Sequence, residues 1–586
     1  MEVTRLFDIP YYQLENFPKS DSLSAKIGGK WVPTSTQEFV DQAMMVSKSL
    51  VAIGIEPGDK VAMISNNRPE WNITDIGILM CGAINVPIYP TISPKDYEFI
   101  FNDSQVKLCF VSDVELLAKV NEIKDNVSTL GPIISFEKID GIEHIEDFKK
   151  RGEQVPTSDI EAKKAAIKAE DLATLIYTSG TTGSPKGVML SHNNITSNVH
   201  GAKERLPVNE TSKAVSFLPL CHIYERMVLY LFMYTGVSIY YAESMETIGD
   251  NIREVKPQVF TAVPRLLEKV FDKIMAKGSE LTGIKKGLFF WAVGLAEVWE
   301  PYGANGAWYE FKLSIANKLI FSKWREALGG NVQAVASGSA ALQARLARIF
   351  NAAGIPVLEG YGLTETSPVA SVNCFDDKGF MIGTVGRTLH NVDIKIAEDG
   401  EILIKGSNVM MGYYNRQDLT DEVVKDGWLH TGDIGKFIDG EYLKITDRKK
   451  EIFKTSGGKY IAPQPMENIY KASRFIDQIM VIGENKKHPA ALIVPDLEYT
   501  LDWCKNNGVS CTNYEDLSSN DQVKAKIWDD IDRLNEEFGS FERVKKIEIC
   551  GFPWTIDTGE LTPSLKLKRK IILQKCDHLV ERIYAG

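Results

Sequence analysis

The chain repeatedly alternates a short apolar run rich in β-branched residues with a stretch of helical periodicity. The clearest helical stretch, ALQARLARIFNAAG, ends at Gly354, and glycine is a natural C-terminal stop. Parallel strands need long crossover connections, which are usually helices. The alternation therefore predicts an α/β fold with parallel-rich sheets covered by helices. The runs expected to form strands are KVAMIS, INVPIYP, KLCFVS, LATLIYT, VSFLPL, VSIYYA, QVFTAVP, VQAVAS and IPVLEGYG.

The pattern changes after about residue 390, where turns become closely spaced. The segments EDGEILIKG, FIDGEYLKITD and IMVIGENKKHPAALIVPD are typical of hairpins of short strands around Gly, Asp and Asn. A chain of 586 residues also exceeds what one hydrophobic core usually serves. We therefore expect a large N-terminal domain over residues 1–446, with a small β-rich part at about 390–446, and a small α+β C-terminal domain over residues 447–586.

Charge and composition exclude several classes of function. The formal net charge of −11 argues against a general nucleic-acid binder. The eight cysteines form no CxxC pair, so we expect no zinc site. The first residues lack the basic end and apolar core of a signal peptide, and no apolar run approaches the roughly 20 residues that span a bilayer. We expect a cytoplasmic protein.

The stretch YTSGTTGSPKGV, residues 177–188, directly follows an apolar run. Glycines let a backbone approach phosphate oxygens closely, hydroxyls add donors, and Lys186 adds a compact positive charge. These features suit phosphate binding, but for this stretch alone a surface turn that is merely rich in glycine is the safer interpretation, so the rest of the sequence has to decide. The Walker P-loop is excluded, because Gly180 and Gly183 have the wrong spacing and Gly187 follows the lysine.

Six further motifs follow this loop. They are LPLCHIYER (218–226), ASGSAAL (336–342), EGYGLTETSPV (359–369), DGWLHTGDIG (426–435), DRKKEIFKTSGGKYIAP (447–463) and GELTPSLKLKRK (559–570). Together the motifs resemble, in the same order, those of the adenylate-forming superfamily of acyl-CoA synthetases, luciferases and peptide-synthetase adenylation domains. Two segments, DGWLHTGDIGKFIDGEYLKITDRKKEIF and IPVLEGYGLTETSPV, resemble especially the long-chain fatty acyl-CoA synthetases. The resemblance implies that the small β-rich part is a distorted barrel and that the C-terminal domain moves about a hinge at Asp447.

The resemblance implies an AMP-forming long-chain fatty acid:CoA ligase that uses ATP, Mg²⁺ and CoA. The fatty acid carboxylate would attack the α-phosphorus of ATP and expel pyrophosphate. The CoA thiol would then attack the acyl-AMP and release AMP. Because both partners of the first step are anions, cationic and N–H stabilisation of the spreading charge is the main requirement.

The nucleotide site implied by the resemblance draws on several motifs. Tyr361 would contact adenine, Thr364 would reach the α-phosphate, and Glu365 would ligate Mg²⁺, which prefers a carboxylate plus phosphate oxygens. Asp433 would hold the two ribose hydroxyls, with Arg448 at the same sugar. The phosphate loop and the glycines beside the adenine would comprise Thr178, Ser179, Gly180, Thr181, Thr182, Gly183, Lys186, Gly360 and Gly362.

Three further positions belong to the reaction by resemblance. Lys568 aligns with the adenylation lysine, whose ammonium bridges the carboxylate and the α-phosphate. The other cations within residues 566–570 leave this alignment open by a residue or two. Lys454 and Gly457 would line the pantetheine entry after the C-terminal domain turns about its hinge.

The acyl end of the substrate would meet two other segments. His222 and Tyr224 fall where the family places residues that flank the acyl carboxylate or gate its tunnel. His222 fits equally well a core histidine bonded to a carbonyl. Gly338, Ser339 and Ala340 would line the floor near the carbonyl, where small side chains leave room for substrate.

Residues 288–324 hold four of the ten tryptophans, and their amphipathic pattern suits either core packing or a weak peripheral contact with the cytoplasmic face of a membrane. The expected partners are a long-chain fatty acid and CoA, for a monomer or a homodimer. Two alternatives stay open within the superfamily, an acyl–acyl carrier protein synthetase and a fatty acyl-AMP ligase. The complete set of phosphate, Mg²⁺, ribose and lysine positions argues against a non-catalytic fatty-acid-binding protein.

Overall fold

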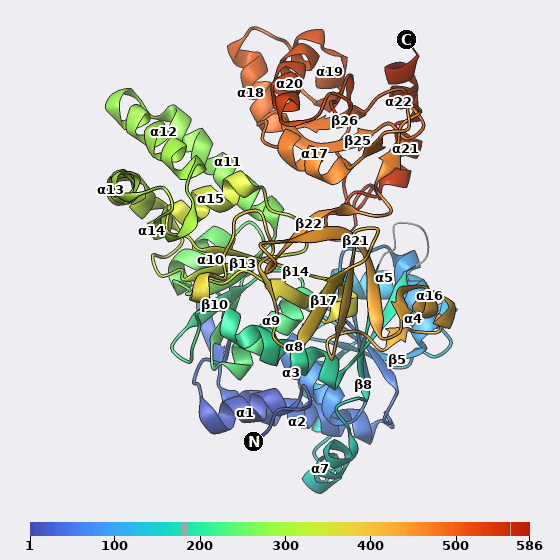
Figure 1. Ribbon diagram of the computed structural model, residues 1–586. Helices are drawn as coiled ribbons and strands as arrows, with labels where there is room; N and C mark the ends of the chain where they lie inside the picture. The colour runs from blue at the N-terminus through green and yellow to red at the C-terminus, as the bar shows by residue number, and fades with distance from the viewer. Residues whose placement is uncertain (179–184, 563, 586) are drawn as a thin grey trace.

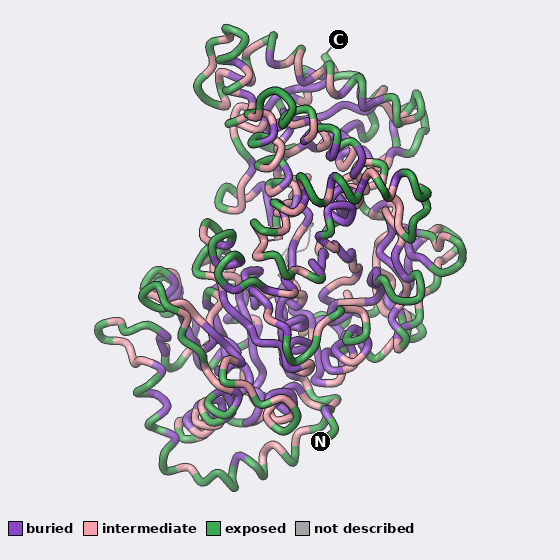
Figure 2. The backbone as a smooth tube through the Cα atoms, turned by 90° about the vertical axis from the view of Figure 1, so that its left-hand side faces the viewer, coloured by how far each residue is buried: buried purple, intermediate pink, exposed green. Residues whose placement is uncertain are grey.

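The computed structural model describes residues 1–178, 185–562 and 564–585, and it confirms the α/β class (Figure 1). Two large sheets occupy the chain up to residue 448, and buried backbone is concentrated along them (Figure 2). The described part of the first sheet has the strand order β19-β9-β8-β4-β3-β5-β6-β7. Its strands are β3 (Lys60–Ile64), β4 (Ile84–Ile88), β5 (Val106–Val111), β6 (Ile133–Ser135), β7 (Glu143–His144), β8 (Leu172–Thr178), β9 (Lys186–Ser191) and β19 (Gly412–Tyr413).

The second sheet follows the order β17-β18-β21-β22-β16-β15-β14-β13-β12-β10-β11-β1-β2, with β20 beside β21. It is parallel from β1 through β11, β10, β12 and β13 to β14, and antiparallel from β14 onward. Its strands are β1 (Leu23–Ile27), β2 (Lys30–Thr34), β10 (Lys213–Ser216), β11 (Ser238–Tyr241), β12 (Val259–Ala262), β13 (Ala334–Ser337), β14 (Val357–Gly362), β15 (Val369–Val372), β16 (Arg387–Thr388), β17 (Val392–Ile396), β18 (Glu401–Gly406), β20 (Val424–Lys425), β21 (Trp428–Ile438) and β22 (Tyr442–Arg448).

Helices connect the parallel strands, as parallel pairing requires. The helix expected before Gly354 is α15, and Gly354 has the left-handed φ of 70° that suits a stop. The helices of this part are α1 (Asp8–Asn16), α2 (Thr36–Ala52), α3 (Pro69–Met80), α4 (Pro94–Ser104), α5 (Val114–Ile123), α6 (Ile145–Lys150), α7 (Thr157–Ala166), α8 (His192–Ala202), α9 (Ile223–Tyr234), α10 (Ile248–Val255), α11 (Pro264–Glu280), α12 (Gly283–Glu297), α13 (Ala307–Ala316), α14 (Ser322–Ala327), α15 (Ala344–Ala352) and α16 (Gln417–Val423).

The β-rich part differs from the expected distorted barrel. Its hairpins β17–β18 and β21–β22 form as predicted. However, the strands that the structure describes there continue the second sheet in open order, and β19 leaves to pair with β9 of the first sheet. The reason is that β15 pairs antiparallel with β14 at the end of the parallel part. The later strands then add to the free edge of β15, beginning with β16.

The chain after Arg448 builds its own sheet, of order β25-β26-β27, and a small hairpin, β23–β24. Two core clusters there contain only residues between 453 and 584. The chain after Arg448 thus has a sheet and hydrophobic cores of its own, as a separate C-terminal domain requires. The domain boundary at residue 447 stays a prediction. Its elements are β23 (Phe453–Lys454), β24 (Tyr460–Ile461), α17 (Pro463–Tyr470), β25 (Ile476–Ile482), β26 (Ala490–Pro495), α18 (Leu497–Asn506), α19 (Tyr514–Ser519), α20 (Asp521–Leu534), β27 (Ile547–Ile549), α21 (Arg569–Lys575) and α22 (Asp577–Tyr584).

A fully buried ion pair joins α9 to α3. Nη2 of Arg226 lies 2.5 Å from Oδ1 of Asp75, and Nη1 donates to the hydroxyl of Thr174 on β8 at 2.8 Å. Asn85 on β4 also donates to Asp75, at 2.6 Å. Because both charges and their remaining polar atoms are satisfied within the interior, the pair fixes α9 against the first sheet.

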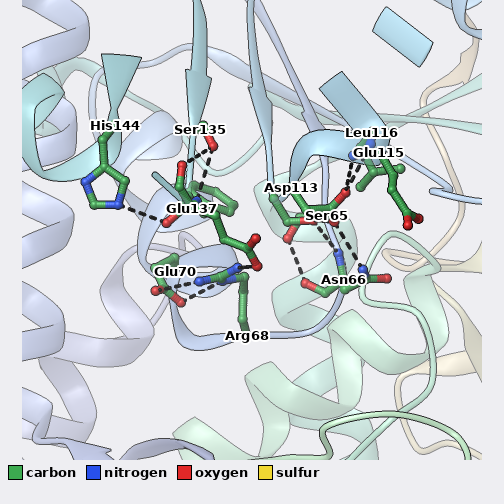
Figure 3. Close-up of polar contacts among 12 residues, drawn as sticks. Ser65, Asn66, Arg68, Glu70, Asp113, Glu115, Leu116, Ser135, Glu137 and His144 are labelled. Atoms are coloured by element: carbon green, nitrogen blue, oxygen red, sulfur yellow. Dashed lines mark hydrogen bonds and ion pairs between the residues drawn. The ribbon is translucent and has the colours of Figure 1, made fainter. Parts of the chain in front are cut away.

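Polar side chains that follow β3, β5 and β6 meet at the carboxyl edge of the first sheet (Figure 3). The amide of Asn66 donates to Asp113 at 3.4 Å, and Asp113 in turn accepts two backbone N–H groups at the start of α5. Arg68 pairs with Glu70 at 3.0 Å and with Glu137 at 3.4 Å. The polar residues at this edge therefore cap a helix and form surface ion pairs.

Candidate active site

The motif EGYGLTE lies at the end of β14, where the second sheet changes from parallel to antiparallel. Tyr361 is buried, and its hydroxyl donates to Oδ2 of Asp433 on β21 at 2.7 Å. A Cβ at Gly362 would collide with the carbonyl oxygen of Pro368, so this position requires glycine. Thr364 is buried in the short turn that follows the strand. The structure thus brings together two motifs that are about 70 residues apart in the sequence.

Asp433 and Arg448 face each other in the β21–β22 pair. Nε of Arg448 lies 3.6 Å from Oδ1 of Asp433. Burial raises the pKa of Asp433, while Arg448, the Tyr361 hydrogen bond and Lys566 act in the opposite direction. The carboxylate is therefore enclosed among hydrogen-bond donors and cations, an arrangement that suits the recognition of paired hydroxyls.

Glu365 lies within reach of a residue that the sequence analysis missed. The hydroxyl of Tyr413 on β19 donates to Oε1 of Glu365 at 2.7 Å. The ammonium of Lys186 lies 5.1 Å from the centre of the Tyr413 ring. After this hydrogen bond, Glu365 keeps further lone pairs that could bind a metal. Mg²⁺ that arrives with the phosphates of a nucleotide fits such a site, because Mg²⁺ takes few protein oxygens. The two strands β9 and β19 pair directly, which places Lys186 and Tyr413 near each other.

The phosphate loop is described only at its ends. Thr178 ends β8, Lys186 begins β9, and the two residues pair with each other across the hairpin. The remaining predicted members, Ser179, Gly180, Thr181, Thr182 and Gly183, lie outside the described residues.

Lys566 is the lysine whose charge interacts with those of Asp433 and Glu365, whereas the predicted adenylation lysine is Lys568, an assignment that stays a prediction. Lys566 is exposed, and the protein atoms near its ammonium lower its pKa by desolvation. Arg448 lowers the pKa of Lys566 further, while Asp433 and Glu365 oppose the change. Lys568 instead precedes α21, where its backbone N–H donates to Glu560 at 2.7 Å. Its neighbour Arg569 pairs with Glu467 at 2.7 Å, which fixes the register of this segment.

Tyr224 lies beside the small-residue segment, and His222 precedes it at the start of α9. The hydroxyl of Tyr224 donates to the carbonyl of Ala336 at 2.8 Å, and a Cβ at Gly338 would lie 3.2 Å from the tyrosine ring. Nδ1 of His222 accepts the backbone N–H of Tyr224 at 3.1 Å and so caps α9. Burial, with Lys566 adding to it, lowers the pKa of His222 to about 4, so the ring is neutral at pH 7.

The two residues after Gly338 shape the turn that leaves β13. Ser339 adopts a left-handed backbone with φ of 69°, and Ala340 is exposed. A left-handed serine is uncommon and marks a turn held by its surroundings. The turn therefore carries only small side chains past the ring of Tyr224.

Lys454 and Gly457 belong to the hairpin β23–β24. Lys454 ends β23 and extends over the ring of Tyr460, 5.3 Å from its centre. Gly457 is in the turn between β23 and β24. In the described parts of the chain, no hydrogen bond or ion pair joins either residue to Glu365 or Asp433.

Two buried carboxyl groups near these motifs were not predicted. Glu225 accepts hydrogen bonds from Ser216 at 2.6 Å and Thr261 at 2.5 Å, and burial raises its pKa to about 7. Burial also raises the pKa of Glu359, one residue before Gly360, to about 8. An acid within an apolar run, as in VLEGYG and IYERMVLY, is the signal that could have revealed both.

The fold and the site together define the class of adenylate-forming enzymes. The chain belongs to the AMP-binding enzyme family, which matches residues 12–414, and residues 450–586 match the C-terminal domain of AMP-binding enzymes.

Several relatives and solved structures are similar over nearly the whole chain. Long-chain-fatty-acid--CoA ligase FadD15 of Mycobacterium bovis is 33% identical over 95% of this chain and 93% of its own length. Long chain acyl-CoA synthetase 4 of Arabidopsis thaliana is 32% identical over 99% and 91%, respectively. The adenylation domain of a carboxylate reductase from Mycobacterium chelonae shares the fold, with a TM-score of 0.78 at 22% identity over 99% of this chain and 91% of that chain. None of the helices in the described ranges has the length and apolar character needed to cross a membrane.

Proposed function

We propose that the protein is an AMP-forming long-chain fatty acid:CoA ligase. The observation that carries the proposal is the convergence of Tyr361, Glu365, Asp433 and Lys566, because it provides an aromatic face, two carboxylates and an ammonium around one position. ATP is an anion with a purine, two ribose hydroxyls and a Mg²⁺-bearing triphosphate, so each group has a counterpart in the substrate. The relatives named above, which are called long-chain ligases and synthetases, support this assignment.

In the first step, a carboxylate oxygen of the fatty acid attacks the α-phosphorus of ATP. The bond from that phosphorus to its bridging oxygen breaks, and pyrophosphate leaves. Lys566, in place of Lys568, draws the two anions together and stabilises the charge that spreads in the transition state. Glu365 would hold Mg²⁺, which neutralises phosphate charge when bound. Thr364 would reach the α-phosphate, and Asp433 with Arg448 would bind the ribose.

In the second step, the thiolate of CoA attacks the acyl carbonyl and AMP leaves. We assign the entry of the pantetheine arm to Lys454 and Gly457. Because no described hydrogen bond or ion pair joins these residues to Glu365 or Asp433, we propose that the C-terminal domain turns about Asp447 between the two steps. The glycine and hydroxyl loop at 178–183, with Lys186, would bind the β- and γ-phosphates and release pyrophosphate.

The acyl chain would pass Tyr224 and the small residues Gly338, Ser339 and Ala340. A neutral His222 can donate one hydrogen bond to the substrate from Nε2 while Nδ1 caps α9. Free CoA is the proposed acceptor, and a monomer or homodimer with a weak peripheral membrane contact is the proposed state.

The experiment that tests this function measures pyrophosphate, AMP and thioester formation by purified protein with Mg²⁺-ATP and fatty acids of graded length, with and without CoA. Turnover that requires CoA and is greatest with long chains is expected. Pyrophosphate release that ignores CoA would instead identify an acyl-AMP ligase or a carrier-protein acceptor. Absence of pyrophosphate release with every acid would overturn the proposal.

A further inference from the structure

Exposed large hydrophobic residues are concentrated in one short part of the described chain. Of 21 such residues, nine lie between residues 284 and 319, a window of 36 positions in 586. Single exposed hydrophobic residues are normal, whereas a contiguous group indicates an interaction surface. The nine residues, called the apolar face below, are Ile284, Phe290, Trp291, Val298, Tyr302, Trp308, Phe311, Ile315 and Leu319.

Helix α13 is apolar on both sides. Its inner residues, including Tyr309 and Leu313, are buried in the core that α12 and α15 share. Trp308 and Phe311, with 70% and 55% of their surface exposed, stack on the outer side at 5.5 Å between ring centres. Ile315 continues this outer side at helical spacing. A helix that packs on a core and faces water should be polar outside, so this outer side lacks its partner.

Helix α12 repeats the pattern beside α13. Its inner residues Phe289, Ala292 and Val293 are buried in the same core. Ile284, Trp291 and Val298 recur at intervals of seven residues, which places them on one outer side. In Figure 1 both helices project from one side of the molecule, away from the two sheets.

Lysines outnumber acids around the apolar face. Within residues 283–323, the exposed charged residues are all lysines, while the exposed acids Glu280 and Glu326 lie just outside this range. Of the three half-buried acids inside it, Glu297 pairs with Arg345 at 2.7 Å, Glu300 pairs with Arg348 at 2.6 Å, and Glu310 is on α13. A local positive rim on a chain of net charge −11 is complementary to an anionic surface. The exposed lysines are Lys285, Lys286, Lys318 and Lys323.

We propose that the outer sides of α12 and α13 dock onto an anionic phospholipid surface, with the apolar face in the acyl boundary and the four lysines at the headgroups. Tryptophan and lysine are the residues that favour this interface, since each has an apolar body and a polar tip. The inner sides of both helices share their core with Tyr224, so a docked membrane lies across one core layer from the proposed acyl site. The proposal goes beyond the ligase reaction and does not depend on turnover.

The test measures binding of the full chain to vesicles, without ATP, CoA or fatty acid, so that its result is independent of catalysis. Sedimentation with vesicles of equal phosphatidylcholine and phosphatidylglycerol is expected, with weaker binding to pure phosphatidylcholine and in high salt. A Trp308→Ser, Phe311→Ser variant should bind at least tenfold more weakly. Lys285→Glu with Lys286→Glu should also lose roughly tenfold or more in partition, since each lysine near an anionic surface contributes severalfold.

Matched controls use comparable residues elsewhere on the surface. Met245→Ser removes an exposed apolar side chain, and Lys95→Glu with Lys138→Glu reverses two exposed charges. Both controls should bind like the wild type. Brominated lipids should quench the wild-type tryptophan fluorescence, a readout that needs no variant to fold.

Equal losses in controls and test variants, or no binding of the wild type to anionic vesicles, would overturn the proposal. A dimer in solution that Trp308→Ser, Phe311→Ser dissociates would also overturn it and assign the face to a second copy.

Discussion

The hydroxyl of Tyr413 donates to Oε1 of Glu365 at 2.7 Å, which joins a two-residue strand to the turn after β14. The hydrogen bond fixes one carboxylate oxygen and so orients the other. Glu365 is therefore positioned by a residue from another sheet before any cation binds.

Replacement of Tyr413 by Phe removes this hydrogen bond while it keeps the ring. The concentration of Mg²⁺ that gives half-maximal adenylation should rise roughly tenfold, since partners that orient a metal ligand commonly change affinity by this amount. Pyrophosphate release measured across a Mg²⁺ titration checks the result. Tyr414→Phe is the matched control, and an equal shift in that variant would assign the effect to general disturbance of β19.

Lys566→Ala should lower the rate of acyl-AMP formation by roughly 10²–10³, the usual cost of losing one preorganised charge at a transition state. Lys568→Ala should change the rate by less than about threefold, because no described ion pair joins the Lys568 side chain to Asp433 or Glu365, whereas the charge of Lys566 interacts with both. Fatty-acid-dependent pyrophosphate release in a single turnover compares the two variants. The reverse ranking would restore Lys568 as the adenylation lysine.

Glu359 predicts a pH dependence of stability. Burial raises the pKa of Glu359 to about 8 from an ordinary value of 4.5, so the folded state holds its proton more tightly than the unfolded state does. This contribution to stability is complete below the unfolded pKa and is lost as pH rises through the folded pKa. Between pH 5 and 9, the thermal midpoint of the wild type should fall by roughly 5 °C relative to that of Glu359→Gln. Glu153→Gln, at an exposed position, should show no such trend. A constant difference between wild type and Glu359→Gln would mean that Glu359 does not bind a proton in this range.

The buried pair of Arg226 and Asp75 predicts a large cost for removing one partner. Arg226→Met should destabilise the protein by about 3–5 kcal/mol, because it leaves Asp75 charged and unpaired in the interior. The double variant with Asp75→Asn should recover part of that loss. Arg416→Met breaks an exposed pair with Asp418 and should cost less than about 1 kcal/mol. Chemical denaturation followed by circular dichroism gives these values.

The sequence predicted the strands well because each buried parallel strand is a short apolar run. The motifs also named Tyr361, Glu365 and Asp433 directly, but they did not indicate that Tyr361 bonds to Asp433 or that Tyr413 bonds to Glu365. The sequence could not show which lysine within residues 566–570 interacts with Asp433 and Glu365. Cations alternate at 566, 568 and 570, and the choice depends on a turn in which Leu565 takes a left-handed φ of 61° and Thr562 accepts the N–H of Lys566.

Tyr413 was missed for a similar reason. It comes 48 residues after Glu365, on a strand whose partner is β9 of the other sheet. Only tertiary pairing brings it to the carboxylate, and no local pattern around GYYN signals such a contact. The distorted barrel was expected from the family resemblance, and the closely spaced hairpins could not test it, because they specify local pairing but not whether a sheet closes.

The register of the β21–β22 pair has an energetic consequence. Asp433 is opposite Arg448, and Ile434 is opposite Asp447, so the proposed ribose carboxylate and the proposed hinge occupy successive rungs of one ladder. Rotation at Asp447 that draws Arg448 away from Asp433 would change the charge that a bound nucleotide meets. A nucleotide then favours one orientation of the C-terminal domain, and by thermodynamic reciprocity that orientation strengthens nucleotide binding by the same free energy. Nucleotide binding and the orientation of the C-terminal domain are thus thermodynamically coupled.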